Sequence, residues 1–146
     1  MKIKEIMTKE PTTVTPNTTV RDAARLMQRE DTGILPVVED SSRKLVAVIT
    51  DRDIAIRVVA DGRDADTPVS DVMSKGHLVT LQPDADVEDA MEKMADEQVR
   101  RIPIVDDRGT LVGIVSQADI VRKARNDRKA ERTVEKISEP SQRHAQ

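Results

Sequence analysis

The 146-residue sequence contains no phenylalanine, tryptophan or tyrosine. The hydrophobic core must therefore be built from Val, Ile, Leu and Ala, with the six methionines filling gaps that aromatic rings would otherwise occupy. Proteins that bind single-stranded nucleic acid stack the bases on aromatic side chains, so this mode of binding is excluded. A flat heterocycle bound here must lie between aliphatic side chains and be recognised by backbone groups.

Cysteine is also absent, which excludes a disulfide framework and thiolate chemistry. The two histidines, His77 and His144, are far apart, and no His or carboxylate cluster has the spacing of a metal site. There are five glycines, and they form no glycine-rich phosphate loop. Nothing in the sequence pairs a nucleophile with a base, so we expect no catalysis, no metal and no catalytic cofactor.

Long hydrophobic runs are missing as well. The first ten residues are charged and lack the apolar region of a signal peptide. No stretch is long enough to cross a membrane as a helix. The sequence therefore predicts a cytoplasmic protein that has no membrane partner.

The charge is acidic overall and unevenly distributed. The 27 acidic residues exceed the 24 basic residues, which gives a net charge of −3. Residues 122–146 contain eight basic and four acidic side chains, so the rest of the chain carries −7. An acidic body does not suit duplex binding, and nucleic acid is not an expected partner. The basic segment is interpreted as a solvated helix end or disordered tail, with contact to an anionic partner as the less favoured alternative.

Two halves of the sequence repeat one pattern at an offset of 66 or 67 residues. Ile6-Met7-Thr8 recurs as Val72-Met73-Ser74, and Leu35-Pro36-Val37-Val38 recurs as Ile102-Pro103-Ile104-Val105. The other matches pair Val20, Asp22, Ala23 and Met27 with Val87, Asp89, Ala90 and Met94, Leu45–Thr50 with Leu111–Ser116, and Asp53-Ile54 with Asp119-Ile120. Because this spacing is maintained over about fifty residues, the chain is a tandem repeat.

Each copy has the pattern of a β-α-β-β-α unit. Helical spacing of apolar residues predicts helices over Val20–Arg29 and Val87–Glu97, and another helix after Thr50 and after Ser116. Thr67-Pro68 predicts the cap and first residue of a short helix. That helix is expected over Val69–Met73, and the strands are expected near Thr13–Thr15, Leu35–Glu39, Lys44–Thr50, Leu78–Leu81, Ile102–Asp106 and Leu111–Ser116.

The predicted fold class is α/β, more specifically α+β, with two repeats packed about a pseudo-two-fold axis. One unit of about 60 residues buries only a modest fraction of its surface, so the two copies are expected to share a core. The first repeat is assigned to residues 1–65 and the second to 66–126. Residues 127–146 form the charged C-terminal tail, as a helix end or a disordered segment.

Two Ser/Thr-x-x-Asp segments carry the clearest candidate chemistry, Thr50–Asp53 and Ser116–Asp119. Each lies where a strand turns into a helix, and the pattern is typical of a capping box. The same geometry suits a ligand, because the helix N-terminus attracts phosphate and the carboxylate can accept hydrogen bonds from ribose hydroxyls. Capping and binding are compatible, so both interpretations stay open.

Three arginines and two proline segments add to these candidates. Arg52, Arg100 and Arg101 can bind phosphate through their planar forks, or can be exposed surface charges. Leu35-Pro36 and Ile102-Pro103 begin strands, and the carbonyl before each proline could accept a hydrogen bond from an adenine amino group. His77 is interpreted as an exposed loop residue.

These features together resemble a tandem pair of cystathionine-β-synthase (CBS) domains, or Bateman module, over about residues 4–125. The resemblance rests on the doubled Met-Thr/Ser start, the doubled apolar-Pro strands and the two Ser/Thr-x-x-Asp segments. It is strongest to small stand-alone prokaryotic proteins. The family implies regulatory binding of AMP, ADP, ATP or an adenosyl ligand in clefts between the repeats.

The resemblance also implies which residues form each cleft. The first cleft would join Val14, Thr15, Thr32, Gly33, Ile34, Leu35 and Pro36 to Ser116 and Asp119. The second would join Val79, Thr80, Arg100, Arg101, Ile102 and Pro103 to Thr50, Arg52 and Asp53. Because the first cleft lacks a nearby arginine in sequence, we expect a phosphorylated ligand in the second.

The leading hypothesis is therefore a sensor that binds an adenine nucleotide and acts on an unidentified regulated protein. The alternative is a protein-interaction scaffold whose nucleotide clefts are empty or vestigial. The family also implies a homodimer formed through the module's helices. The apolar faces expected to form it contain Ala23, Met27, Ala90, Met94, Ile54 and Ile120.

Overall fold

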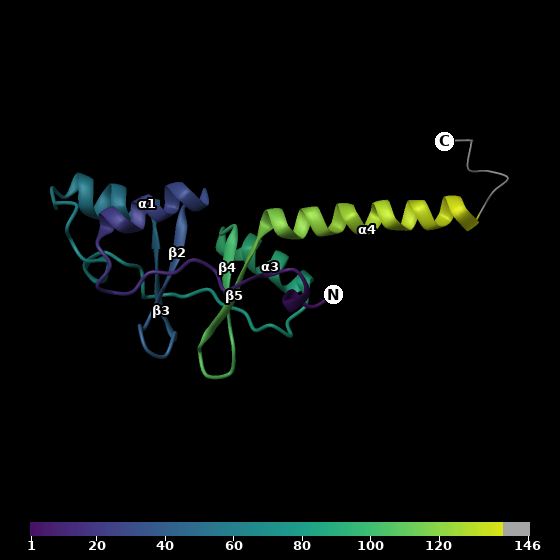
Figure 1. Cartoon of the computed structure of the whole chain (residues 1–146), viewed down its shortest axis with the longest axis horizontal. Helices are drawn as coiled ribbons and strands as arrows, with labels where there is room; N and C mark the ends of the chain where they lie inside the picture. The colour runs from purple at the N-terminus through teal and green to yellow at the C-terminus, as the bar shows by residue number, and fades with distance from the viewer. Residues whose placement is uncertain (139–146) are drawn as a thin grey trace.

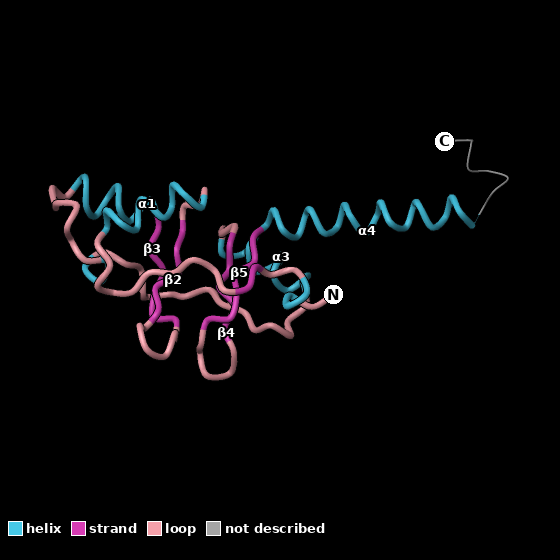
Figure 2. The backbone as a smooth tube through the Cα atoms, viewed as in Figure 1, coloured by secondary structure: helices cyan, strands magenta, loops and turns pink. Residues whose placement is uncertain are grey.

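Two antiparallel hairpins lie at the centre of the structure, one from each sequence repeat. The computed structural model describes residues 1–138 of the chain. The first hairpin pairs β2 (Ile34–Val38) with β3 (Leu45–Thr50), and the second pairs β4 (Arg101–Val105) with β5 (Leu111–Ser116). The hairpins stand side by side with their loops at the same end, and helices cover the opposite end (Figures 1 and 2). The fold is α+β, as the sequence predicts.

The helices α1 (Val20–Glu30) and α3 (Val87–Glu97) confirm the two predicted amphipathic helices. The Thr19 hydroxyl accepts a hydrogen bond from the Asp22 N–H at 3.2 Å, and Asp86 caps the second helix in the same position. Each helix turns its small and flexible apolar side chains inward. The buried residues are Ala23 and Met27 in α1, and Ala90 and Met94 in α3.

The last helix of each repeat begins where the sequence predicts, directly after the hairpin. In the first repeat, α2 (Asp51–Ile54) continues as the π-helix η2 (Ala55–Ala60). In the second, α4 (Gln117–Ser138) is a single long helix that projects away from the body (Figure 1). Of the predicted tail 127–146, residues up to Ser138 are therefore helical, and 139–146 lie outside the described residues.

The predicted first strand of each repeat is wrong in form. Thr13–Thr15 and Leu78–Leu81 contribute single parallel bridges, Val14 to Val37 and Leu81 to Ile104, instead of regular strands. A two-residue strand, β1 (Thr8–Lys9), lies earlier in the chain and pairs with β5. Thr8–Lys9 has no apolar alternation from which a strand could be predicted. It becomes a strand because it pairs with the hairpin of the opposite repeat.

The two short helices at the repeat starts are tighter than an α-helix. η1 (Ile3–Glu5) and η3 (Val69–Asp71) are both 3-10 helices. Pro68 is the N-cap of η3, whereas the sequence pattern made it the first helical residue. The helix itself is present over Val69–Asp71, two residues shorter than the predicted Val69–Met73.

The start of each repeat packs against the core of the other repeat. Thr8 pairs with Ile114 of the second hairpin, and Ser74 pairs with Val48 of the first. The apolar side chains follow the same exchange. Ile3 is fully buried with Ile102, Ile104 and Val115, while Val69 and Val72 are buried in the core of the first repeat.

This exchange makes the two cores mutually dependent. The backbone bonds are reciprocal: the Leu45 N–H donates to Gly109 O and the Leu111 N–H donates to Arg43 O, both at 3.0 Å. Leu45 and Leu111 are equivalent in the repeat, and so are Arg43 and Gly109, so the contacts follow a pseudo-two-fold axis. The core of each repeat therefore includes side chains from the start of the other repeat. The division of the sequence into residues 1–65 and 66–126 stays a prediction.

Two exposed ion pairs hold the N-terminal segment on the second repeat. Lys2 lies 3.0 Å from Asp86, and Lys4 lies 2.9 Å from Asp84. The pKa values of Asp86 and Asp84 are lowered, first by hydrogen bonds from these lysines and then by their charges. The pairs therefore favour folding at neutral pH, and this contribution is lost as the pH falls through the lowered pKa values.

Among residues 1–138, no helix combines the length and the apolar character needed to span a membrane.

Candidate functional site

Both Ser/Thr-x-x-Asp segments form the predicted capping boxes. In the first, the Thr50 N–H donates to Asp53 Oδ2 and the Asp53 N–H donates to Thr50 Oγ1, both at 3.0 Å. In the second, the Ser116 N–H donates to Asp119 Oδ2 at 3.1 Å and the Asp119 N–H donates to Ser116 Oγ at 3.0 Å. Each box fixes a helix N-terminus at the end of a central strand.

Asp53 has an additional partner that the sequence pattern did not identify. The Ser74 hydroxyl, from the start of the second repeat, lies 3.0 Å from Oδ1 and 3.1 Å from Oδ2 of Asp53. Asp53 is 7% exposed. Among the residues that the structure describes, it is the one charged residue that is buried. The repeat had marked Ser74 as the counterpart of Thr8, but it gave no sign of this contact. Both oxygens of Asp53 are therefore already hydrogen-bonded within the protein.

Asp119 has the same cap but different surroundings. Its Oδ1 lies 3.3 Å from an Arg122 guanidinium nitrogen one turn along α4, and its side chain is 18% exposed. No hydroxyl from the opposite repeat is bonded to it among the described residues. Asp119 is consequently the more accessible of the two capping carboxylates.

A pocket of about 180 Å³ lies between the two repeats. The first repeat supplies the segment Thr32–Pro36 through Thr32, Ile34, Leu35 and Pro36, which the sequence assigned to the first cleft. The second repeat supplies Arg101 and Ile114. Thr8, Pro11, Thr12 and Glu30 complete the lining. The structure therefore brings the apolar-Pro segment of one repeat against the hairpin of the other.

The expectation that the first cleft has no nearby arginine is wrong. Arg101 and Ile34 are equivalent residues at the starts of β4 and β2, and both line the pocket between the repeats. The pseudo-two-fold axis places these two strand starts next to each other, so an arginine far away in sequence reaches the first cleft. Arg101 also pairs in register with Ser116, which the sequence assigned to that cleft.

A second hollow, of about 730 Å³, adjoins this pocket through Arg101. It lies over the first turns of α4 and includes Ser116 and Gln117. The Gln117 N–H donates to the Arg100 carbonyl at 2.8 Å, which fixes the start of α4 against β4. The lining consists of Arg100, Arg101, Ser116, Gln117, Ala118, Val121, Arg122, Arg125 and Asn126.

The residues assigned to the second cleft are more dispersed. Ile102 and Pro103 are buried in β4, Val79 and Thr80 are half-buried, and Arg52 is exposed on α2. Among the residues whose side chains are described, Arg100 or Arg101 lines three hollows in which Thr50, Arg52 and Asp53 take no part. In the first cleft, Val14 is buried beside Val37, and the Thr15 N–H donates to Thr18 Oγ1 at 3.1 Å. Gly33 packs under the carboxylate of Asp51.

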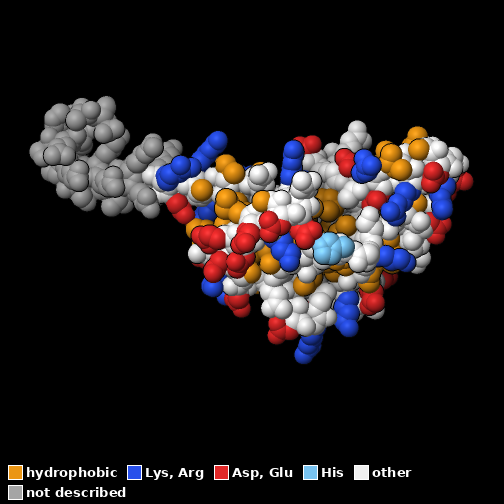
Figure 3. Space-filling model, turned by 180° about the vertical axis from the view of Figure 1, so that it is seen from behind, with side chains coloured by type: hydrophobic (Ala, Val, Ile, Leu, Met, Phe, Trp, Pro, Cys, Tyr) orange, Lys and Arg blue, Asp and Glu red, His pale blue; other side chains and the backbone are white. Residues whose placement is uncertain are grey.

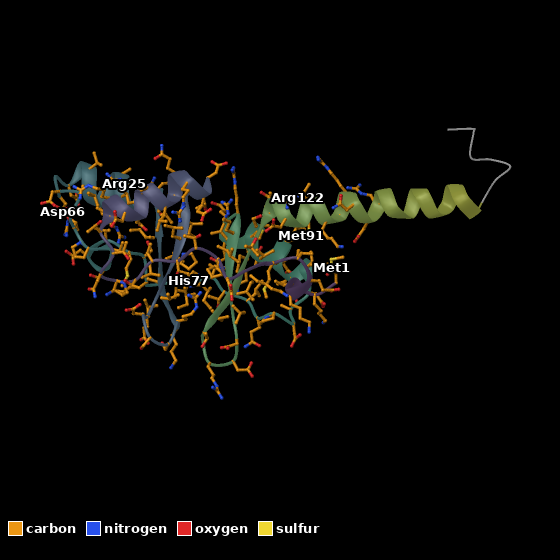
Figure 4. All side chains as sticks on the ribbon, viewed as in Figure 1. Met1, Arg25, Asp66, His77, Met91 and Arg122 are labelled. Carbon is orange, nitrogen blue, oxygen red and sulfur yellow. The ribbon has the colours of Figure 1, made fainter. Side chains whose placement is uncertain are left out.

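The apolar residues expected at a dimer interface are mostly internal. Ala23, Met27, Ala90, Met94 and Ile120 are buried in the cores, and Ile54 is half-buried. The helices instead expose Ile56, Val59, Met91 and Val121, with Val59 the most exposed at 72%. We call these four side chains the outer helix surface, and Figure 4 labels one of them, Met91 on α3.

His77 lies in an exposed loop, as predicted (Figure 4). Its Nε2 is 3.1 Å from Glu97 Oε2, so the imidazole has a carboxylate neighbour. Among residues 1–128, whose side chains the structure describes, no group of three or more His, Asp or Glu side chains is arranged to hold a metal ion.

Comparison with known proteins is consistent with this arrangement. The family model of the CBS domain matches the chain twice, over residues 3–60 and 69–126. The CBS domain-containing protein YhcV of Bacillus subtilis (strain 168) is 48% identical over 118 residues, covering 81% of each chain.

Solved structures of similar proteins carry different bound species. The CBS domain pair of protein MJ0100, in complex with 5-methylthioadenosine and S-adenosyl-L-methionine, has a TM-score of 0.75 and 28% identity over 87% of this chain and 98% of its own. CBSX2 in complex with AMP has a TM-score of 0.74, with the same identity and coverage. Hypoxic Response Protein I with two coordinated zinc ions has a TM-score of 0.74 and 33% identity over 84% of this chain and 98% of its own. With both repeats matched by the family model, this chain belongs to the CBS domain family and contains two CBS domains in tandem.

Proposed function

We propose that this CBS pair is a regulatory module that binds an adenine nucleotide or an adenosyl compound between its repeats, without catalysing a reaction. The observation that carries the proposal is the pocket in which Thr32, Ile34, Leu35 and Pro36 of one repeat face Arg101 of the other. AMP, ADP and ATP are the proposed natural ligands. The complexes of MJ0100 and CBSX2 support this class of ligand for a CBS pair.

The pocket and the neighbouring start of α4 together offer a partner for each part of a nucleotide. Ile34, Leu35, Pro36 and Ile114 offer an aliphatic surface for a base in a chain that has no aromatic side chain. Asp119 lies at the N-terminus of α4 and can accept hydrogen bonds from ribose hydroxyls. Arg101 and the Ser116 hydroxyl can donate to phosphate, and the helix N-terminus adds a favourable dipole.

The distribution of arginine favours the first cleft for a phosphorylated ligand. The sequence had favoured the second cleft, because it grouped Arg100 and Arg101 with Arg52. The first cleft is supported instead by Arg100 and Arg101, which line one hollow with Ser116, and by Arg101, which lines the pocket with Thr32 and Ile34. The second cleft, with Thr50, Asp53, Val79 and Thr80, stays a proposed site for a less charged adenosyl ligand. In that cleft a ribose hydroxyl would share Asp53 with the Ser74 hydroxyl, which already donates to it.

Calorimetry with AMP, ATP and S-adenosylmethionine tests the proposal directly. We expect saturable binding of at least one of them, and we expect Asp119→Ala to weaken binding by about 10- to 100-fold. That range corresponds to losing hydrogen bonds to a charged group, which contribute about 1.5–3 kcal/mol. Asp127→Ala is the matched control, because Asp127 lies farther along the same helix and pairs with Lys123, whereas Asp119 is hydrogen-bonded to Ser116 at the edge of the larger hollow.

The outcome that contradicts the proposal is equally clear. If none of the three compounds gives heat or a thermal shift at millimolar concentration, the scaffold hypothesis with empty clefts is preferred. Folding of the variants is checked by far-UV circular dichroism, since the chain has no tryptophan or tyrosine fluorescence. For the same reason, a co-purified adenine compound would dominate the near-ultraviolet absorbance.

We further propose that the module forms a homodimer through its outer helix surface. The exposed apolar side chains Ile56, Val59, Met91 and Val121 lie on the last helices and on α3. Sedimentation velocity should give twice the chain mass of 16.2 kDa. Val59→Asp combined with Met91→Asp should shift the protein to the monomer, because burying a charge in an apolar interface is unfavourable.

A control variant separates this effect from a general effect of charge. Asn17→Asp changes an exposed residue outside these helices and should leave the mass unchanged. A wild-type protein that sediments as a monomer at micromolar concentration would contradict the dimer. The cytoplasmic location and the regulated partner protein stay predictions from the sequence.

A further inference from the structure

Four arginines surround the larger hollow beside the first cleft. Arg100 and Arg101 come from the start of β4, and Arg122 and Arg125 come from successive turns of α4. The lining contains no Asp or Glu. Asp119, which lies 3.3 Å from Arg122, is a neighbour of this hollow and is not part of its lining. The hollow is therefore a concentrated region of positive charge.

This concentration contrasts with the rest of the molecule. The chain carries a net charge of −3, and acidic side chains gather on the body near the base of the long helix (Figure 3). Asp119 balances part of the charge at Arg122, but the four arginines leave an excess of positive charge, and their repulsion is relieved when an anion binds among them. Guanidinium groups bind phosphate oxygens in a bidentate way, so phosphate is the anion that this arrangement suits best.

The position of the hollow connects it to the proposed nucleotide cleft. Arg101 lines both the hollow and the pocket that contains Thr32 and Leu35. If the base of a nucleotide lies in the aliphatic pocket, its first phosphate would lie beside Arg101 and Ser116. Further phosphates would then extend over α4 toward Arg122 and Arg125.

The equivalent surface of the first repeat lacks this charge. At the repeat offset, the counterparts of Arg100, Arg101, Arg122 and Arg125 are Gly33, Ile34, Ile56 and Val59. Gln117 is replaced by Asp51, whose Oδ2 lies 2.8 Å from the position that a Cβ atom on Gly33 would take. The first repeat therefore presents a carboxylate and apolar side chains where the second presents four cations. The charge belongs to one cleft and is not a general property of the fold.

We propose that Arg100, Arg101, Arg122 and Arg125 form a polyphosphate subsite, through which the first cleft binds ATP or ADP in preference to AMP. Arg122 and Arg125 contact the phosphates beyond the first. This proposal rests on the proposed nucleotide function of the same cleft. It adds that the cleft distinguishes nucleotides by their number of phosphates. Arg101 alone would contact only the first phosphate and could not make this distinction.

The test compares AMP, ATP and inorganic tripolyphosphate by calorimetry on the full chain. Wild-type protein should bind ATP at least about 10-fold more tightly than AMP, because each additional charge-assisted contact contributes favourably. Arg122→Gln combined with Arg125→Gln should weaken ATP and tripolyphosphate by about 10-fold or more. AMP binding should change less than about two-fold, because these two arginines lie beyond its phosphate.

A matched double variant distinguishes specific contacts from long-range attraction. Lys123→Gln combined with Arg128→Gln removes the same amount of charge from the same helix, and neither residue lines the hollow. This control should leave the preference for ATP over AMP intact. Equal losses in the two double variants, or equal wild-type affinities for AMP and ATP, would overturn the polyphosphate subsite.

Failure of the nucleotide proposal would give a different result. If neither AMP nor ATP binds, the nucleotide function is rejected, and tripolyphosphate then tests the arginines separately. Binding of tripolyphosphate that Arg122→Gln and Arg125→Gln abolish would support the arginines as a polyphosphate site. Absence of tripolyphosphate binding to the wild-type protein would overturn it.

Discussion

Changing Arg101 to glutamine is expected to weaken ATP binding by about 10- to 100-fold, the range given by losing about 1.5–3 kcal/mol of charge-assisted hydrogen bonding. Arg101 lines both the pocket between the repeats and the arginine hollow. A nucleotide that extends from the pocket into the hollow would therefore contact it. Unlike Arg122 and Arg125, it lies where the first phosphate would be bound. We therefore expect AMP and ATP to be weakened together, as calorimetry at fixed ionic strength would show.

Arg108→Gln provides the matched control for this experiment. Arg108 is an exposed arginine at the far end of the same β4–β5 hairpin, and it lines neither the pocket nor the hollow. Its removal changes the net charge equally and should leave the affinity for ATP within about two-fold of wild type, which is less than 0.5 kcal/mol. If Arg108→Gln weakens ATP as much as Arg101→Gln does, the effect is long-range attraction and the proposed contact is wrong.

Ile3→Ala is expected to lower the free energy of unfolding by about 2–4 kcal/mol, within the usual range for truncating a buried isoleucine. Ile3 is near the N-terminus, where truncation is often harmless. Here its side chain is fully buried among Ile102, Ile104 and Val115 of the second repeat. Urea denaturation followed by far-UV circular dichroism measures the change, and the loss is a large fraction of a typical stability of about 5–15 kcal/mol.

The neighbouring variant Lys4→Ala separates core packing from surface charge. Lys4 pairs with Asp84 at 2.9 Å, but both side chains are exposed, and exposed ion pairs contribute little. We expect its denaturation midpoint to match wild type within experimental error. Hydrogen exchange adds a second measurement: Ile3→Ala should increase exchange in β4 and β5 more than in β2 and β3. Equal exchange in both hairpins, or a wild-type midpoint, would contradict the exchanged packing of the N-terminal segment.

Most of the elements could be predicted because they are encoded locally. The helices at Val20 and Val87 have helical spacing, a cap before them and apolar residues on one face. The strands from Leu45 and Leu111 are short, continuous apolar runs that end at capping boxes. The strand β1 could not be predicted, because Thr8–Lys9 has no pattern of its own and pairs only through the hairpin of the opposite repeat.

The candidate site was predicted in part for the same reason. The segments Thr50–Asp53 and Ser116–Asp119 were recognisable, because the residues of a capping box are neighbours in sequence. The bond from Ser74 to Asp53 joins residues 21 positions apart across the two repeats, and nothing in the sequence encodes that distance. The assignment of Arg101 to the second cleft had the same cause, since a repeat identifies equivalent residues but not which of them face each other.

The sequence by itself determined that this chain consists of two copies of one α+β unit, with an aliphatic core and no aromatic platform for a base. It also determined which residues cap the last helices. Only the tertiary structure decided how the copies combine, because the start of each repeat buries its apolar side chains in the core of the other. That exchange and the pseudo-two-fold axis bring Ile34 and Arg101 into the lining of one pocket, and α4 then adds Arg122 and Arg125 to the hollow beside it. Periodicity and capping act between neighbours in the chain, whereas the charge of a cleft depends on side chains that meet only after both repeats have packed.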